Sequence, residues 1–199
     1  MVLVDYALAP EHPFPAAADD VLRCYQALAR DAHQVAITGD SAGGNLALGL
    51  ASRVTGEWAS RNAVVVGVAA LSPVTDLTLS GATYETRAAA DPFFTRAQVA
   101  ELVQAYLGSA DPHDPLASPL HSPLAGMPPV SIHVGDDEVL LDDSRRYVER
   151  AVAVGVDARL DVWMGMAHGF VSGVGKLKAS AQALDTLGAF LAARWQAGA

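Results

Sequence analysis

GDSAG, residues 39–43, lies between the apolar run VAIT at 35–38 and the helix-like segment GNLAL at 44–48. A strand that turns this sharply into a helix forms a nucleophile elbow, which holds its central serine in a strained backbone conformation. Such a turn lifts the serine hydroxyl clear of the sheet. The context therefore predicts acyl-transfer chemistry at Ser41.

Small residues around the serine support the same interpretation. The positions two before and two after Ser41 need to be nearly free of side chains, and Gly39 and Gly43 meet that need. The N–H of Ala42 and the positive end of the following helix are expected to face an oxyanion. The alternative is a glycine-rich phosphate loop, or a plain β–α turn with an incidental serine. Because no lysine follows Gly44, a Walker-type loop is disfavoured.

Composition favours one acidic globular domain. A chain of 199 residues, 51% of them hydrophobic, can bury one sizeable core without a second domain. A net charge of −9 and the lack of a Lys/Arg cluster argue against nucleic acid binding. The single cysteine, Cys24, cannot form an internal disulfide, which favours a cytoplasmic location. We find neither a secretory h-region at residues 1–6 nor an apolar run of membrane-spanning length.

Short β-branched runs alternate with longer amphipathic stretches, which predicts an α/β fold with a mainly parallel sheet. The expected strands are 2–6, 35–39, 63–71, 129–134 and 158–163. The expected helices are 15–31, 43–57, 96–107, 142–155 and 176–196. The last of these is expected to cover one face of the sheet. Residues 76–124 break the alternation with prolines and one short helix, so we interpret them as a cap-like insertion in a single domain, 1–199.

A serine nucleophile needs a base, and in open α/β sheets it is expected on a loop at the carboxyl end of a later strand. His168 fits, because it follows the strand 158–163 in a loop flanked by Gly165 and Gly169. The other histidines are expected to have surface or structural roles: His12, His33, His113, His121 and His133.

The acid that orients the base is expected after the strand 129–134, where Asp136, Asp137 and Glu138 follow one another. Any of the three can orient an imidazole, and the run can equally be a solvated turn before a helix. A metal site is not expected, because the run lacks alternating ligand spacing and no Cys or His pair supports it.

Further motifs give the chain a family resemblance. DYALAPEHPFPAA at 5–17 and GDSAGGN at 39–45 resemble the bacterial hormone-sensitive lipase family of esterases. The similarity continues at SPVTDL 72–77, YL 106–107, SPL 118–120, EVLLDDS 138–144 and GMAHGF 165–170. The resemblance implies an α/β-hydrolase fold, no cofactor, and cleavage of carboxylic esters with short or medium acyl chains through a Ser–His–acid triad.

Ser41 and His168 match the family's nucleophile and base directly. The family's acid is usually an Asp followed by Pro-Leu and a charged pair. Matching that pattern back from Leu140 places the acid on Glu138, with Asp137 as the alternative one residue away.

The chain departs from the family at its start, where it begins with the family's fourth strand and lacks a His-Gly-Gly-Gly loop. That loop normally supplies further oxyanion donors, so we expect the N–H of Ala42 to act without them and turnover to be weak. A strand of the family's sheet lies between 2–6 and 35–39. Its absence is expected to leave both edges unpaired or to force the two strands together.

The leading hypothesis is the C-terminal two-thirds of a serine esterase that acts on small-molecule esters. The alternatives are a catalytically impaired remnant or interaction module, and an α/β-hydrolase peptidase or acyltransferase. Homodimerisation through the last strand and helix is implied by the resemblance. Phe93 and Phe94 are interpreted as anchors of the insertion and are left out of the site.

Overall fold

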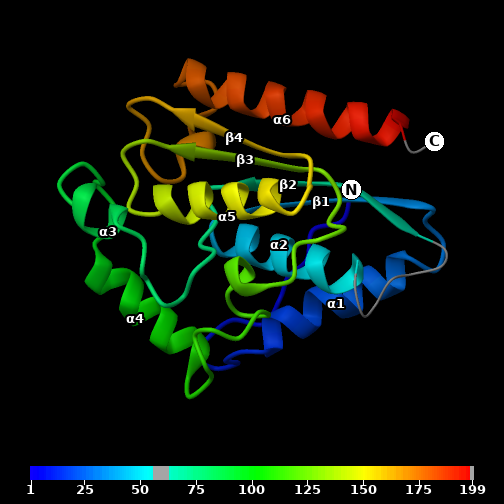
Figure 1. Ribbon diagram of the computed structural model, residues 1–199, viewed down its shortest axis with the longest axis horizontal. Coiled ribbons are helices and arrows are strands. Elements are labelled where there is room, and N and C mark those ends of the chain that lie inside the picture. Colours follow the sequence, from blue (N-terminus) through cyan, green and yellow to red (C-terminus); the bar gives the residue numbers. More distant parts are fainter. Residues whose placement is uncertain (56–62, 198–199) are drawn as a thin grey trace.

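A four-stranded parallel sheet forms the centre of the protein, in a computed structural model that describes residues 1–55 and 63–197 (Figure 1). The strands lie side by side in chain order, β1 (Gln34–Asp40), β2 (Val64–Leu71), β3 (Val130–Gly135) and β4 (Ala158–Trp163). The helices are α1 (Ala16–Leu28), α2 (Ala42–Thr55), α3 (Thr83–Thr86), α4 (Arg96–Leu107), α5 (Leu141–Ala153) and α6 (Lys178–Ala197), with short 3-10 helices η1 (Pro119–His121) and η2 (Phe170–Gly173). The predicted α/β architecture is confirmed. The end of the helix predicted at 43–57 lies outside the described residues.

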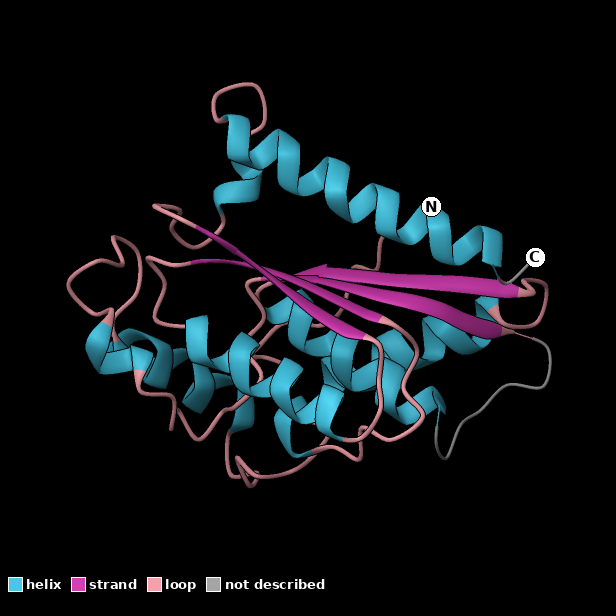
Figure 2. Ribbon diagram, turned by 45° about the horizontal axis from the view of Figure 1, so that its top comes forward, coloured by secondary structure: helices cyan, strands magenta, loops and turns pink. Residues whose placement is uncertain are grey.

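Helices cover both faces of the sheet. α6 lies on one face together with the short η2, whereas α1, α2 and α5 lie on the other (Figure 2). Successive residues of β2 point to opposite faces, as a strand requires, so that Ala69 and Leu71 pack beneath α6 while Val68 and Ala70 face the opposite layer. The prediction that the last helix covers one face of the sheet is confirmed.

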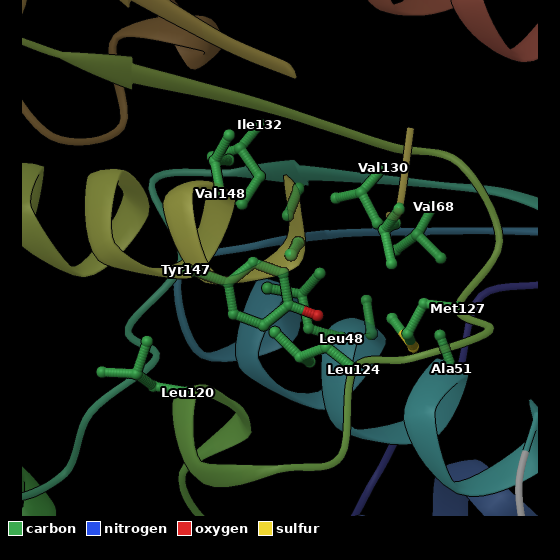
Figure 3. Packing of buried hydrophobic residues seen from close by; sticks show 14 residues of the cluster. Leu48, Ala51, Val68, Leu120, Leu124, Met127, Val130, Ile132, Tyr147 and Val148 are labelled. Carbon is green, nitrogen blue, oxygen red and sulfur yellow. The ribbon is translucent and has the colours of Figure 1, made fainter. Parts of the chain in front are cut away.

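The larger hydrophobic core lies between the sheet and the layer that contains α2 and α5. Leu48 and Ala51 of α2 meet Val130 and Ile132 of β3, with the ring of Tyr147 from α5 beside them (Figure 3). All five are buried. Branched aliphatic side chains on β3 and small or flexible ones on α2 allow the helix to approach the sheet closely. Because this core is tightly packed, the carboxyl ends of β1 and β3 keep fixed positions relative to each other.

The prediction of a strand at 2–6 is wrong. Residues 1–5 are exposed and have no regular structure, and β1 stands at the edge of the sheet. Backbone groups of a strand need a neighbour to bond with, and among the described residues the sheet offers this segment none. Neither expected consequence is observed as stated, because β1 has an unpaired edge while residues 2–6 form no strand at all. The segment is tied down further along, where Ala7 N–H donates to Asp20 Oδ2 at 2.9 Å.

The insertion 76–124 contains more structure than the one helix expected there. It carries α3 and η1 as well as α4, and α3 and α4 lie on the side toward which β3 and β4 point (Figure 1). α4 begins with a capping box, in which the Thr95 side chain accepts from Gln98 N–H and the Gln98 side chain accepts from Thr95 N–H. α3 has only four residues, so its sequence lacks the periodicity that would reveal it.

Candidate active site

Ser41 lies between the last residue of β1 and the first residue of α2, in the left-handed conformation with φ of +55°. Few residues other than glycine adopt this conformation, and it marks strain. Two bonds hold it there: Ser41 N–H donates to Leu71 O at 2.8 Å, and Asn45 N–H donates to Ser41 O at 3.1 Å. The predicted strand, turn and helix are all present.

Of the two glycines expected to exclude side chains around Ser41, the structure supports this role for Gly39 and not for Gly43. A Cβ on Gly39 would lie 2.1 Å from the carbonyl oxygen of Gly43, so no side chain fits at Gly39. A Cβ on Gly43 would meet nothing within 4 Å, and the expectation that this position excludes side chains is wrong. Gly44 is the second crowded position, because a Cβ there would lie 2.9 Å from Cβ of Pro73. The turn is tight on its strand side and against Pro73, and it is open at Gly43.

His168 reaches Ser41 from the loop between β4 and η2. Its Nε2 lies 3.0 Å from Ser41 Oγ, and its Nδ1 lies 3.0 Å from Oε2 of Glu138. Because an ionised carboxylate can only accept, Nδ1 carries the proton and Nε2 of the neutral ring is free to accept the serine O–H. The imidazole therefore has the tautomer that a general base for Ser41 needs.

Glu138 is the carboxylate that the structure brings to His168. Its side chain is completely buried, and Oε1 accepts from Ser72 Oγ and from Gly135 N–H, both at 2.7 Å. Asp137, the alternative, lies on the same loop, where its N–H donates to Met166 O at 3.1 Å. The structure thus brings together Ser41, His168 and Glu138 from the carboxyl ends of β1, β4 and β3.

The charges around His168 favour its protonated form. Burial is the largest single influence and lowers the pKa of the imidazole, but the hydrogen bond and charge of Glu138, together with the charges of Asp40 and Asp91, raise the pKa of His168 overall. Its side chain is only 10% exposed. This environment stabilises the imidazolium that forms when the ring takes a proton.

A cavity of about 330 Å³ opens beside Ser41. It lies between residues 6–9, the start of α2, and the face of α4 that carries Val99 and Val103. Most of the lining side chains are hydrophobic, so the cavity suits an apolar group rather than a charged one. Its position places such a group next to the serine hydroxyl.

Phe94 is outside the predicted site, but the structure places it against His168. Its ring packs edge-on against His168, with ring centroids 5.1 Å apart, and it also lines the cavity. Phe93 is exposed. The Asp91 side chain fixes this turn by accepting from the N–H groups of both phenylalanines, at 2.9 and 3.0 Å. Because an Asp side chain often accepts from the backbone N–H two residues further on, Asp91 is the sequence signal for this turn.

Ala42 is the first residue of α2, and its N–H is among those at a helix start that lack an acceptor within the helix. It follows Ser41 directly, in the position from which a backbone N–H can face an oxyanion in this type of turn. Within residues 1–55 and 63–197, no cluster of three or more His, Cys, Asp or Glu side chains is arranged to hold a metal ion. No helix in this part of the chain is both long and apolar enough to cross a membrane.

A family model described as the alpha/beta hydrolase fold matches residues 1–172. An acetyl-hydrolase from Streptomyces hygroscopicus is 34% identical over 194 residues, which cover 96% of this chain and 64% of the relative. An esterase from Acinetobacter venetianus is 36% identical over 174 residues, covering 85% of this chain and 56% of the relative. The chain therefore spans about three-fifths of the length of these curated relatives.

Solved structures agree with the match to the alpha/beta hydrolase family model. The chain matches an esterase/lipase from an uncultured bacterium with a TM-score of 0.91 and 37% identity, covering 98% of this chain and 65% of that one. A hormone-sensitive lipase from a metagenome library matches with a TM-score of 0.89 and 36% identity, over 96% and 65% of the two chains. The predicted fold class is confirmed.

Proposed function

The chain belongs to the α/β-hydrolase family, in the group of bacterial esterases related to hormone-sensitive lipase, and on that basis we propose that it hydrolyses carboxylic esters of short to medium acyl chain. The observation that carries the proposal is the pair of 3.0 Å contacts linking Ser41, His168 and Glu138 beside an apolar cavity. A nucleophile, its base and the base's orienting carboxylate lie within hydrogen-bond reach of one another.

In the proposed first step, Ser41 Oγ bonds to the ester carbonyl carbon while His168 Nε2 takes the hydroxyl proton. The carbonyl oxygen becomes an oxyanion, which the N–H of Ala42 stabilises. Glu138 accepts from Nδ1 and stabilises the imidazolium without itself being protonated. When the carbonyl re-forms, the alcohol leaves with the proton from Nε2, and the acyl group stays on Ser41.

The second step returns the enzyme to its starting state. A water molecule attacks the acyl carbon while His168 Nε2 takes one of its protons, and the carboxylic acid leaves as that proton returns to Ser41 Oγ. We place the acyl group in the cavity between residues 6–9 and α4, since its wall is mostly apolar and meets Ser41. Removing one oxyanion donor from a serine hydrolase costs about 3–4 kcal/mol. We therefore expect slow turnover if Ala42 acts without a second donor.

Hydrolysis of p-nitrophenyl butyrate by the purified 199-residue chain tests the proposal, with Ser41→Ala as the paired variant. Circular dichroism first establishes that both chains fold. Release of p-nitrophenol that the substitution abolishes supports Ser41 as the nucleophile. Equal rates from two folded chains contradict the esterase proposal for this chain and favour the impaired remnant.

We further propose a homodimer formed through β4 and α6. β4 stands at an edge of the four-stranded sheet, and Leu184 and Trp195 of α6 are exposed hydrophobic side chains. Light scattering after size exclusion gives the mass directly, and a monomer at micromolar concentration contradicts this proposal.

A cytoplasmic location is proposed from the single Cys24 and is tested by fractionating the producing cell.

A further inference from the structure

Ser72 begins the SPVTDL motif at 72–77 and directly follows the last residue of β2. Its side chain is buried, with 1% of the residue exposed, and its Oγ donates to Oε1 of Glu138 at 2.7 Å. Ser72 N–H donates to His133 O at 2.8 Å, which continues the β2–β3 pairing by one bond. The hydroxyl of Ser72 therefore meets the carboxylate from a rigid position.

The backbone of Ser72 is strained. Its φ is +43°, in the left-handed region that serine seldom adopts, and Pro73 follows it. A proline at the next position restricts the preceding residue further. Non-glycine residues in such conformations persist where the surrounding structure demands them, and they gather at functional sites. Glycine would satisfy the backbone here at lower cost, yet the residue present is one whose hydroxyl reaches Glu138.

The hydrogen bonds divide the two oxygens of Glu138 between different tasks. Oε1 accepts from Ser72 Oγ and Gly135 N–H, while Oε2 accepts from His168 Nδ1. A buried carboxylate needs its oxygens satisfied, and each donor lost carries a penalty. Without Ser72, a single backbone N–H would hold Oε1, and the carboxyl plane would be free to turn away from His168.

We propose that Ser72 is a positioning residue of the active site, which holds Oε1 of Glu138 so that Oε2 faces His168. This inference rests on the proposed function. The hydroxyl of Ser72 bonds Oε1 of Glu138, so it acts on the base through that carboxylate. If Ser72 merely filled space beside β2, the effect of substituting it would not depend on whether Glu138 is present.

Kinetics of the full 199-residue chain with p-nitrophenyl butyrate test this dependence. Ser72→Ala removes the hydroxyl and keeps the Cβ, whereas Ser72→Gly also relieves the backbone strain. We expect both to lower kcat about tenfold with KM unchanged, as loss of one hydrogen bond to a charged group does. Ser72→Cys, which keeps a weak donor, is expected to recover part of the loss.

The control is Ser122→Ala. Ser122 is a buried serine in the insertion, and its hydroxyl donates to Pro115 O at 2.8 Å rather than to a triad residue. We expect wild-type kcat from this variant. A double-mutant cycle supplies the second criterion, because Ser72→Ala made in a Glu138→Gln background is expected to cause little further loss. An equal loss in both backgrounds would overturn the proposal.

An NMR titration of His168 in isotope-labelled chain needs no turnover, so it separates failure of this inference from failure of the esterase proposal. The charged groups that raise the pKa of His168 are Glu138, Asp40 and Asp91. With Glu138 free to turn, we expect the pKa of His168 to fall in Ser72→Ala and to stay in place in Ser122→Ala. A folded Ser72→Ala chain with an unchanged His168 titration and unchanged kcat contradicts the proposal. If wild type hydrolyses no ester, the titration alone decides.

Discussion

The turn that holds Ser41 and the loop that holds Glu138 are built in different ways. The turn at 39–45 has contacts among its own residues, between Gly39 and Gly43 and from Asn45 N–H to Ser41 O, and its remaining contacts, with Leu71 O and Pro73, come from the end of the neighbouring strand β2. The loop at 135–139 depends on partners far away in the chain. Ser72 bonds Glu138, Asp91 Oδ2 accepts from Val139 N–H at 2.9 Å, and Thr83 Oγ1 donates to Val139 O at 2.7 Å. Local contacts thus have a larger part in the turn at Ser41, whereas the loop at Glu138 is held mainly by contacts from distant residues.

Glu138→Gln tests the acid's loop most severely. An amide keeps the shape but can present its NH₂ group to His168, which then favours the wrong tautomer. We expect kcat to fall about 10⁴-fold, as in other serine hydrolases whose triad acid becomes an amide. Steady-state hydrolysis of p-nitrophenyl butyrate measures it.

Asp137→Asn is the matched control, since Asp137 is the adjacent carboxylate and its recorded contact with the His168 loop is made by its backbone N–H. We expect a change of less than about twofold. A larger loss from Asp137→Asn than from Glu138→Gln would show that the two acids have the opposite roles.

Gly39→Ala and Gly43→Ala compare two positions of the turn. A methyl group at Gly39 would overlap the Gly43 carbonyl, and backbone cannot give way cheaply, so we expect a loss of about 4 kcal/mol or more in the free energy of unfolding. A methyl group at Gly43 enters open space within α2 and is expected to change stability by about 1 kcal/mol or less. Urea unfolding measures both. Equal losses would contradict the local account of this turn.

Asp91→Ala weakens the acid's loop from a distance. Three backbone donors lose their acceptor, those of Phe93, Phe94 and Val139, and we expect a loss of about 2–3 kcal/mol in the free energy of unfolding. Asp114→Ala, which removes a single such bond to Leu116 N–H, serves as the control and should cost about 1 kcal/mol. Urea midpoints that fall equally in the two variants would argue against a special role for Asp91.

The pH dependence of kcat/KM gives the smallest expected effect. His168 acts as a base only when neutral and its pKa is raised, so activity should fall as the pH drops through a value above the ordinary 6.5 of histidine. Asp91 contributes to this raised pKa, and Asp91→Ala should move the acidic limb slightly toward lower pH. Gly43→Ala should leave it in place. A limb that moves with Gly43→Ala instead would mean that the turn also sets the charge of the base.

Much of the site could be predicted because its central residues carry local signals. The GDSAG turn places Ser41, and the glycine-flanked loop after β4 places His168. Ser72 has no such signal, because a serine before a proline looks like an ordinary turn until Glu138 is seen beside it. The place of Phe94 could not be predicted for the same reason, since its contact with His168 joins segments more than seventy residues apart. The strand expected at 2–6 has the right residues and lacks a neighbour to pair with.

Sequence alone predicted the alternating α/β layers, Ser41 and His168 as the proposed nucleophile and base, and the three carboxylates that could serve as the acid. These follow from short-range patterns of burial, backbone conformation and loop position that do not depend on distant residues. Tertiary structure decided which carboxylate meets His168, which serine holds it, and which side chains line the cavity beside Ser41. Each of those outcomes depends on distances of about 3 Å between side chains on different strands and loops, and only the packed sheet sets such distances.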